Sequence, residues 1–287
     1  MRVLILGASG QIGSVIFSGL ENSYEVSGTS RKTYGNLLKF DPFKDDWSTL
    51  GKFDVLINCV GQIEPTAESS FHHIHVDLTS TIIANRGNIG NPRIVQISAL
   101  GASANHQVDF LKTKGLADDL LLRHPDTAVI RPSIVCTHRT MLVKKMRMLS
   151  NLSRISFGFL PVPKGFLQTK VQPIMPQDLV ALVRKACFDR SINVIEAVGP
   201  VPLSFGEIIQ LLETNRGRRL RTLEIPRTPI DAVVKRLIVP LWPGVINSQQ
   251  YDLLFNDNIA DADKCSRLLG RAPIDSRAFF REEFSIN

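Results

Sequence analysis

A glycine-rich turn stands near the start of the sequence, between an apolar run and a helical pattern. The apolar run is Val3-Leu4-Ile5-Leu6, and the turn is Gly7-Ala8-Ser9-Gly10-Gln11-Ile12-Gly13. Apolar residues then recur at the spacing of one helix face, at Ile12, Val15, Ile16 and Leu20. A buried strand, a tight turn and an amphipathic helix in this order are typical of the opening of a dinucleotide-binding unit. The alternative is an ordinary strand-to-helix turn.

Glycines in such a turn let backbone N–H groups approach a pyrophosphate, and the helix N-terminus favours its negative charge. Any Cβ at these positions would block the phosphates or the contact between helix and strand. The residues that we expect to contact a cofactor here are Gly7, Ser9, Gly10, Gln11, Ile12 and Gly13.

A basic turn follows the second predicted strand, at 25–29. NAD-specific sites place an acidic residue about twenty residues past the glycines, where it binds the ribose 2′-hydroxyl. This sequence has Ser30-Arg31-Lys32 instead. A guanidinium binds phosphate through paired, charge-assisted hydrogen bonds. The turn therefore favours NADP(H), with its 2′-phosphate, over NAD, and a solvated basic turn is the alternative.

Composition limits the class of protein. The 287 residues are 44% apolar and 21% charged, which is ordinary for a globular protein of one or two domains. No apolar stretch approaches the ~20 residues of a transmembrane helix, and the start leads directly into a strand, without a signal peptide. We therefore expect a cytoplasmic protein whose four scattered cysteines are free thiols, at Cys59, Cys136, Cys187 and Cys265.

The net charge of +7 favours anionic partners, and basic residues concentrate at 144–147 and 216–221. Neither run is interleaved with aromatic residues or lies in a recognition motif, so a solvated face is expected and nucleic acid is not. The apolar segment 228–242 is expected to cover a substrate cleft, with weak contact to a membrane surface as the alternative. Neither the identity of a small-molecule substrate nor the oligomeric state follows from the sequence.

Strands alternate with helices in the first half of the sequence, which predicts an α/β fold with a doubly wound parallel sheet, the Rossmann type. We assign 1–150 to this dinucleotide-binding domain and 151–287 mainly to a smaller C-terminal substrate or cap domain. The further predicted strands are 37–40, 55–59, 93–98 and 128–131, and the predicted helices are 75–84, 110–123 and 141–151.

The segment 171–200 is expected to return to the sheet, through a helix ending at Cys187 and a strand at 193–198. Ser204 and Glu207 have the spacing of a capping box, which predicts the start of another helix.

Three motifs occur in a fixed order along the sequence: Ile97-Ser98-Ala99-Leu100-Gly101-Ala102, Phe110-Leu111-Lys112-Thr113-Lys114-Gly115 and Ile130-Arg131-Pro132-Ser133. Together with the GxxGxxG spacing of the first turn, they resemble the atypical and extended short-chain dehydrogenase/reductases. The resemblance is to the group that includes the NADPH-binding accessory subunit of respiratory complex I, and it is looser after Ile225. It implies further cofactor contacts at Asp41, Cys59, Val60, Gly61, Lys114 and Pro132.

The resemblance also implies a catalytic set of Ser, Tyr and Lys. The tyrosine hydroxyl transfers a proton, the lysine lowers its pKa and holds the nicotinamide ribose, and the serine orients the carbonyl. Ser98 and Lys114 fit this set, but the tyrosine position, four residues before the lysine, holds Phe110. Phenylalanine has no titratable proton, so the standard mechanism cannot run. His106 and Asp109 lie just before Phe110, and His106, one helical turn away, is the candidate replacement donor.

A cluster of histidines, His72-His73-Ile74-His75, stands at the start of a predicted helix. It lacks a cysteine or carboxylate at the spacing of known metal sites. We expect a solvated loop here and no metal.

Three functions remain open. The favoured one is an NADP(H)-binding protein of this family type in which the standard oxidoreductase turnover is weak, displaced or absent. One alternative is an active NAD(P)-dependent reductase or a sugar epimerase or dehydratase that uses another proton donor. The other is a non-catalytic structural or redox-sensing subunit. Because sugar epimerases of this kind also use the tyrosine, Phe110 counts most against them.

Overall fold

The structure is a computed structural model that describes residues 1–63, 69–140, 159–214, 221–228, 231 and 248–282. The helix predicted at 141–151 lies outside the described residues, as does nearly all of the apolar segment 228–242.

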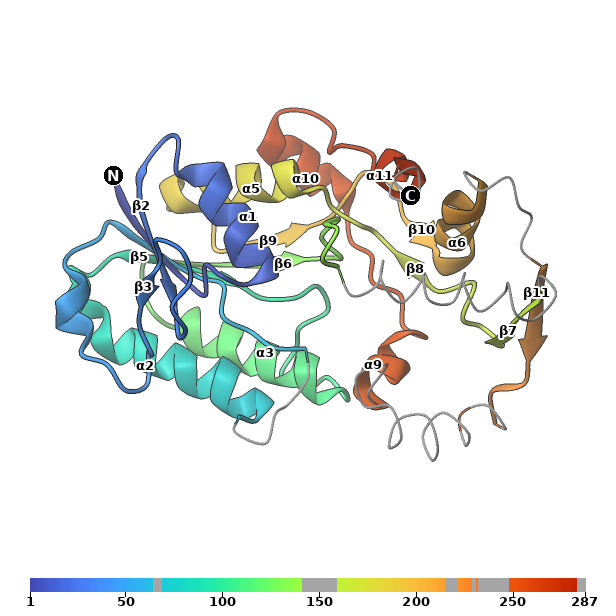
Figure 1. The fold of residues 1–287 in the computed structure, drawn as a ribbon, viewed down its shortest axis with the longest axis horizontal. Helices are drawn as coiled ribbons and strands as arrows, with labels where there is room; N and C mark the ends of the chain where they lie inside the picture. The colour runs from blue at the N-terminus through green and yellow to red at the C-terminus, as the bar shows by residue number, and fades with distance from the viewer. Residues whose placement is uncertain (64–68, 141–158, 215–220, 229–230, 232–247, 283–287) are drawn as a thin grey trace.

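One parallel sheet of seven strands forms the centre of the larger part of the molecule (Figure 1). The doubly wound parallel sheet predicted from the sequence is confirmed. The strands at its centre are mostly apolar because helices cover both faces. In spatial order they are β3 (Leu38–Lys39), β2 (Glu25–Ser30), β1 (Arg2–Leu6), β4 (Val55–Asn58), β5 (Arg93–Ile97), β6 (Thr127–Pro132) and β9 (Val194–Ala197).

Helices α1 (Gln11–Leu20), α5 (Pro176–Phe188) and α10 (Ala262–Leu269) cover one face of this sheet. Helices α2 (Leu78–Asn85) and α3 (Asp109–Leu121) cover the other (Figure 1). Alternate residues of a strand point to opposite faces. Accordingly Val3 and Ile5 of β1 pack with α1 and α5, whereas Leu4 and Leu6 pack with α2.

A smaller C-terminal part occupies the right half of Figure 1 and has its own core, which includes Leu160, Phe166, Phe205 and Ile208. Its strand pairs are β7 (Phe159–Pro163) with β11 (Arg221–Ile225) and β8 (Lys170–Val171) with β10 (Leu203–Ser204). Its helices are α6 (Phe205–Thr214), α9 (Ser248–Leu253) and α11 (Arg277–Glu282).

The capping box predicted at the start of α6 is confirmed. Ser204 N donates to Glu207 Oε2 at 2.7 Å, and Glu207 N donates to Ser204 Oγ at 3.1 Å. The hydrogen bonds that Ser204 N and Ser204 Oγ donate to the carboxylate lower the pKa of Glu207.

The chain returns from the smaller part to the main sheet twice. The first return is β9, which pairs in parallel with β6 at the place predicted for strand 193–198. The second is α10, which we expected in the cap: its Cys265 belongs to the main core. Asp178 of α5 fixes this second return, since its buried carboxylate accepts hydrogen bonds of 2.6 Å from both Arg271 Nη2 and Ile274 N.

The prediction of a solvated loop at the histidine cluster is wrong. A π-helical turn, His73–Asp77, leads directly into α2, and His75 is only 3% exposed. The physical reason is an apolar stripe that includes Ile74 and Leu78 and presses this segment against the sheet. His72 and His73 instead face the solvent side and contact Asp77 at 3.1 and 3.2 Å.

Within the described residues, no group of three or more His, Cys, Asp or Glu side chains could hold a metal ion. In the same part of the chain, no helix is long and apolar enough to cross a membrane.

Candidate functional site

The predicted site segments meet at the edge of the sheet that is formed by the carboxyl ends of its strands. The glycine turn follows β1, residues 58–61 end β4 and continue past it, Ser98 follows β5, and Pro132 ends β6. The four strands are parallel and adjacent in the order β1-β4-β5-β6, so their carboxyl ends lie side by side. The strand order reverses between β1 and β4, and open α/β sheets bind ligands in the crevice at such a point.

The glycine turn divides into structural glycines and one that faces open space. Gly7 has a φ of +75°, which favours glycine, and a Cβ at Gly13 would lie 2.1 Å from the Gly7 carbonyl oxygen. A Cβ at Gly10, by contrast, would meet only that same oxygen, at 3.2 Å. Gly10 immediately precedes α1, so it leaves the space before the helix N-terminus clear.

The basic turn after β2 is joined to the glycine turn. Ser9 Oγ donates to Ser30 Oγ at 3.1 Å, and Lys32 N donates to the same oxygen at 3.3 Å. Ser30 is buried, whereas the side chains of Arg31 and Lys32 are exposed. The structure thus brings two exposed cations next to the predicted phosphate-binding turn.

Among the other residues predicted around this turn, Gln11 and Ile12 contact distant segments and Asp41 has a local contact. Gln11 Nε2 donates to Thr140 Oγ1 at 3.1 Å, and Ile12 packs against the main core. Asp41 accepts a hydrogen bond of 3.0 Å from Phe43 N within its own turn.

The segment after β4 contacts the glycine turn directly, because a Cβ at Gly7 would lie 3.0 Å from Val60 Cγ2. Burial raises the pKa of the Cys59 thiol to about 12, so this cysteine stays protonated and is a poor nucleophile.

Lys114 of α3 is buried between the ends of β4 and β5. Its Nζ donates to the Ile97 carbonyl at 3.1 Å, and a Cβ at Gly61 would lie 3.1 Å from the same nitrogen. Burial lowers the pKa of Lys114 to about 8, with the charge of Asp118 acting in the opposite direction.

Phe110 lies one helical turn before Lys114, at the position where the resemblance implies a tyrosine. Its ring packs edge-on against Phe71 and His75, with centroid distances of 5.9 and 5.8 Å. The local environment is therefore aromatic.

The hydroxyl of Ser98 is engaged away from this position. Ser98 Oγ donates at 2.8 Å to Oδ2 of Asp118, a fully buried carboxylate that also accepts from Arg131 Nε and Gln96 Nε2. Burial raises the pKa of Asp118, and Arg131 opposes that shift. The single proton of the serine is thus used within a buried polar network.

His106 has a local hydrogen bond and lines a pocket of its own. Its Nδ1 accepts the backbone N–H of Val108 at 2.9 Å. It lines a pocket with Asp252 and Asn256, and the lining of that pocket includes none of Ser98, Phe110 and Lys114.

His75 is a residue of this edge that our sequence interpretation missed, because we considered it only as a metal ligand. Its Nδ1 lies 2.8 Å from Thr113 Oγ1, and its Nε2 has no hydrogen-bond partner among the described residues. The pattern that could have found it is helical: His75 shares the inward face of its helix with Phe71, Leu78 and Ile82.

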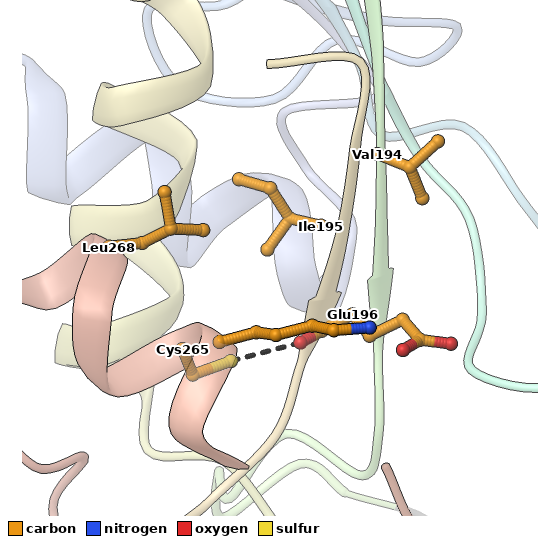
Figure 2. Close-up of a pocket in the computed structure, with 6 residues that line it drawn as sticks. Val194, Ile195, Glu196, Cys265 and Leu268 are labelled. Atoms are coloured by element: carbon orange, nitrogen blue, oxygen red, sulfur yellow. Dashed lines mark hydrogen bonds between the residues drawn. The ribbon is translucent and has the colours of Figure 1, made fainter. Parts of the chain in front are cut away.

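A second pocket lies at the far edge of the sheet, between β9 and α10 (Figure 2). Ile195 of the strand points toward Leu268 and Cys265 of the helix, whereas Val194 and Glu196 point away from it. The Cys265 thiol donates to the Glu196 carbonyl at 2.9 Å. Strands β4, β5 and β6 separate this pocket from the glycine turn.

Two curated proteins are similar to the chain in sequence. The NADH-ubiquinone oxidoreductase 40 kDa subunit of Neurospora crassa is 21% identical over 295 residues, covering 96% of this chain and 76% of the relative. The NADH dehydrogenase [ubiquinone] 1 alpha subcomplex subunit 9 of Arabidopsis thaliana is 28% identical over 242 residues, covering 77% of this chain and 58% of the relative. Both are named as mitochondrial proteins. No family model matches the sequence.

Solved structures share the fold over nearly the whole chain. A nucleoside-diphosphate-sugar epimerase from Staphylococcus aureus has a TM-score of 0.74 at 13% identity, covering 98% of this chain and 100% of that one. UDP-glucuronic acid 4-epimerase from Bacillus cereus, with UDP-glucuronic acid and NAD, has a TM-score of 0.70 at 17% identity, covering 99% and 97%. RMD from Pseudomonas aeruginosa, complexed with NADPH, has a TM-score of 0.67 at 15% identity, covering 99% and 98%.

The resemblance to the atypical short-chain dehydrogenase/reductases is confirmed. At these identities the solved structures establish the fold alone, and the site residues stay predictions.

Proposed function

We propose that this chain binds NADP(H) at the carboxyl edge of β1, β4 and β5 and lacks the standard serine-tyrosine-lysine turnover. The residues present fit the cofactor. Gly10 leaves clear the space before α1 that a pyrophosphate needs, and Arg31 and Lys32 are exposed next to it. Lys114 is the group that would hold the nicotinamide ribose. A bound nicotinamide supplies hydride transfer, for which the chain would have to provide a proton.

The names of the structural neighbours support a nicotinamide dinucleotide but not the choice between its two forms. The epimerase from Bacillus cereus is named with NAD, and RMD from Pseudomonas aeruginosa with NADPH. The preference for NADP(H) rests on Arg31 and Lys32, which take the place of an acidic residue after β2.

The proposed absence of standard turnover rests on one observation: at two of the three catalytic positions, the side chain lacks a hydroxyl that is available to a substrate. Phe110 has no hydroxyl and packs among aromatic rings. The hydroxyl of Ser98 donates its hydrogen bond to Asp118 and is therefore not available to orient a substrate carbonyl. Lys114 alone retains a role, which is consistent with binding without catalysis.

Calorimetric titration with NADPH and NADH, followed by a turnover assay with a broad panel of carbonyl compounds, tests both halves of this proposal. We expect NADPH to bind, NADH to bind several-fold more weakly, and the oxidation of NADPH to stay at background. Failure of both dinucleotides to bind would overturn the cofactor assignment, and robust oxidation would overturn the lack of turnover.

A second candidate function is that of a non-catalytic subunit with protein partners. It is favoured by the two curated relatives, which are named as subunits of NADH-ubiquinone oxidoreductase or NADH dehydrogenase. Co-purification of the tagged protein with NADH dehydrogenase activity, from its own cells, tests it. The cytoplasmic location expected from the sequence stays a prediction, since both relatives are mitochondrial by name.

The catalytic alternatives require a proton donor other than Phe110. An NAD(P)-dependent reductase or a sugar epimerase or dehydratase could use His106 or Asp109 only if one of these side chains reached the substrate. His106 lines a different pocket, which weighs against this alternative. Their substrate would be a small molecule of unassigned class.

A further inference from the structure

The imidazole of His75 is buried beside the candidate cofactor site, and one of its nitrogens has no hydrogen-bond partner in the part of the chain that the structure describes. The residue is only 3% exposed, and its Nε2 makes no hydrogen bond within the described residues. An unsatisfied buried polar atom costs ~1–3 kcal/mol, so such an atom calls for an explanation.

The hydrogen bonds of Thr113 assign the proton on this ring. Thr113 Oγ1 donates its one proton to the Asp109 carbonyl at 2.8 Å. It therefore accepts from His75 Nδ1, which lies 2.8 Å away and carries the proton. The lone pair of the neutral imidazole is then on Nε2.

His75 is also held in its neutral form. Burial lowers the pKa of His75 to about 2, and the nearby charge of Lys114 acts in the same direction. At neutral pH Nε2 is thus a hydrogen-bond acceptor, and a ligand group that binds to it must be a hydrogen-bond donor.

The small volume that a Cβ at Gly61 would occupy lies next to both His75 Nε2 and the Lys114 ammonium. A Cβ at Gly61 would lie 3.1 Å from Lys114 Nζ and 3.9 Å from His75 Nε2. This volume is at the end of β4, and the adjacent Val60 contacts Gly7 of the glycine turn. A ligand that crosses the edge from the glycine turn toward β5 passes it.

We propose that His75 Nε2 accepts a hydrogen bond from a hydroxyl of the ribose next to the nicotinamide, in a volume that it shares with Lys114. This inference rests on the proposed function, because it assumes that the dinucleotide binds at this edge. A hydroxyl suits both neighbours, since it can accept from an ammonium and donate to an imidazole. A cationic donor does not, because it would lie beside the charge of Lys114. Ribose offers two adjacent hydroxyls of this kind.

The first test compares ring-preserving variants by calorimetry. His75→Phe keeps the packing against Phe71 and Phe110 and removes the acceptor. Thr113→Val keeps the histidine but removes the group that fixes the proton on Nδ1, so Nε2 can become protonated. Each should weaken NADPH binding roughly 3- to 10-fold, the effect of one net hydrogen bond. Thr113→Ser, which keeps the hydroxyl, is the matched control and should bind as wild type does.

A truncated ligand separates this inference from the proposed function. Adenosine 2′,5′-bisphosphate carries the 2′-phosphate and lacks the nicotinamide ribose, so His75→Phe should leave its affinity unchanged. If wild type binds neither this compound nor NADPH, the proposed function is wrong. If wild type binds both and His75→Phe retains full NADPH affinity, the assignment of His75 is wrong.

Gly61→Ala tests the shared volume without changing His75. Its methyl group meets only the mobile end of Lys114 closely, so the protein should fold, and NADPH affinity should fall at least 3-fold, a loss of the same order as one net hydrogen bond. Gly87→Ala, where a Cβ meets only Asn91 Oδ1 at 3.9 Å, is the control and should not change binding.

Nitrogen NMR of the wild-type protein with labelled histidine needs no variant. We expect the His75 Nε2 resonance at the position of an unprotonated nitrogen, shifted by NADPH and unmoved by adenosine 2′,5′-bisphosphate. A protonated Nε2 in the free protein, or a resonance that NADPH does not move, would overturn the proposal.

Discussion

The hydroxyl of Ser98 donates a 2.8 Å hydrogen bond to Oδ2 of Asp118, a carboxylate with no exposed surface. Arg131 pairs with the same oxygen at 2.9 Å, and Gln96 binds the other at 3.2 Å. A serine that looks catalytic from its motif is therefore part of the polar support between β5, β6 and α3. We therefore expect Ser98 to contribute to the stability of the fold and not to cofactor binding, and the two effects can be measured independently.

Replacing Ser98 by Ala should lower stability and leave cofactor affinity unchanged. The variant leaves a buried carboxylate with one donor fewer, which costs about 1–3 kcal/mol of unfolding free energy. Denaturant unfolding measures this loss, and titration with NADPH measures the affinity. Ser80→Ala removes an exposed serine hydroxyl on α2 and should change neither quantity. Wild-type stability in Ser98→Ala together with a loss of binding would contradict the structural role.

Replacing Arg31 by Ala should weaken NADPH binding and hardly affect NADH. Removing one charge-assisted hydrogen bond to a phosphate costs about 1.5–3 kcal/mol, or roughly 10- to 100-fold in affinity. Arg267→Ala, at an exposed arginine of α10 on the opposite edge of the sheet, is the charge-matched control. Equal affinities of wild type for the two dinucleotides would contradict the preference for NADP(H).

Replacing Gly10 by Val should abolish dinucleotide binding in a protein that still folds. The new side chain enters the space before α1, and the backbone at Gly10, with φ −71°, tolerates it. Gly13→Val should instead prevent folding, because its Cβ would lie 2.1 Å from the Gly7 oxygen. Circular dichroism and calorimetry distinguish the two results. Normal NADPH affinity in a folded Gly10→Val variant would show that this turn does not bind the phosphates.

Replacing Phe110 by Tyr restores a hydroxyl one helical turn before Lys114. We expect no turnover from wild type and at most weak reductase activity from this variant, because Ser98 stays engaged with Asp118. Phe110→Leu serves as the control without a hydroxyl. Should wild type instead turn over a carbonyl substrate robustly, His106→Ala and Asp109→Ala would test the alternative donors, since losing a general acid costs about 10²–10⁴-fold in kcat.

Replacing Lys114 by Met should change how stability depends on pH. Burial lowers the pKa of Lys114 to about 8 from 10.5, so between these values the unfolded chain binds more protons than the folded one. Stability contributed by this group therefore rises as pH increases from about 8 to 10.5, by at most ~1.4 kcal/mol per pH unit. The difference between wild type and Lys114→Met in urea unfolding isolates this slope from other groups. An identical pH dependence in both proteins would contradict the shifted pKa.

The sequence by itself determined the main sheet, since local patterns encode it. An apolar run, three glycines and a helical stripe are enough to predict β1, the turn and α1, and similar patterns place β4, β5 and β6. The pair Ser204 and Glu207 likewise encodes a helix start within four residues. The position of Phe110 one helical turn before Lys114, where the resemblance implies a tyrosine, is also read from the sequence, because it depends on spacing within one helix.

Only the tertiary structure decided which side chains share the site. His75 and Thr113 are 38 positions apart, and their contact exists because the helices that carry them pack together on one face of the sheet. The return of α10 to the main core depends on Asp178 meeting Arg271, 93 positions away, which no local pattern encodes. The hydrogen bond from Ser98 to Asp118 could not be predicted from the sequence for the same reason. Local propensity fixes the period of an element, whereas burial and hydrogen-bond satisfaction are settled by packing between distant segments.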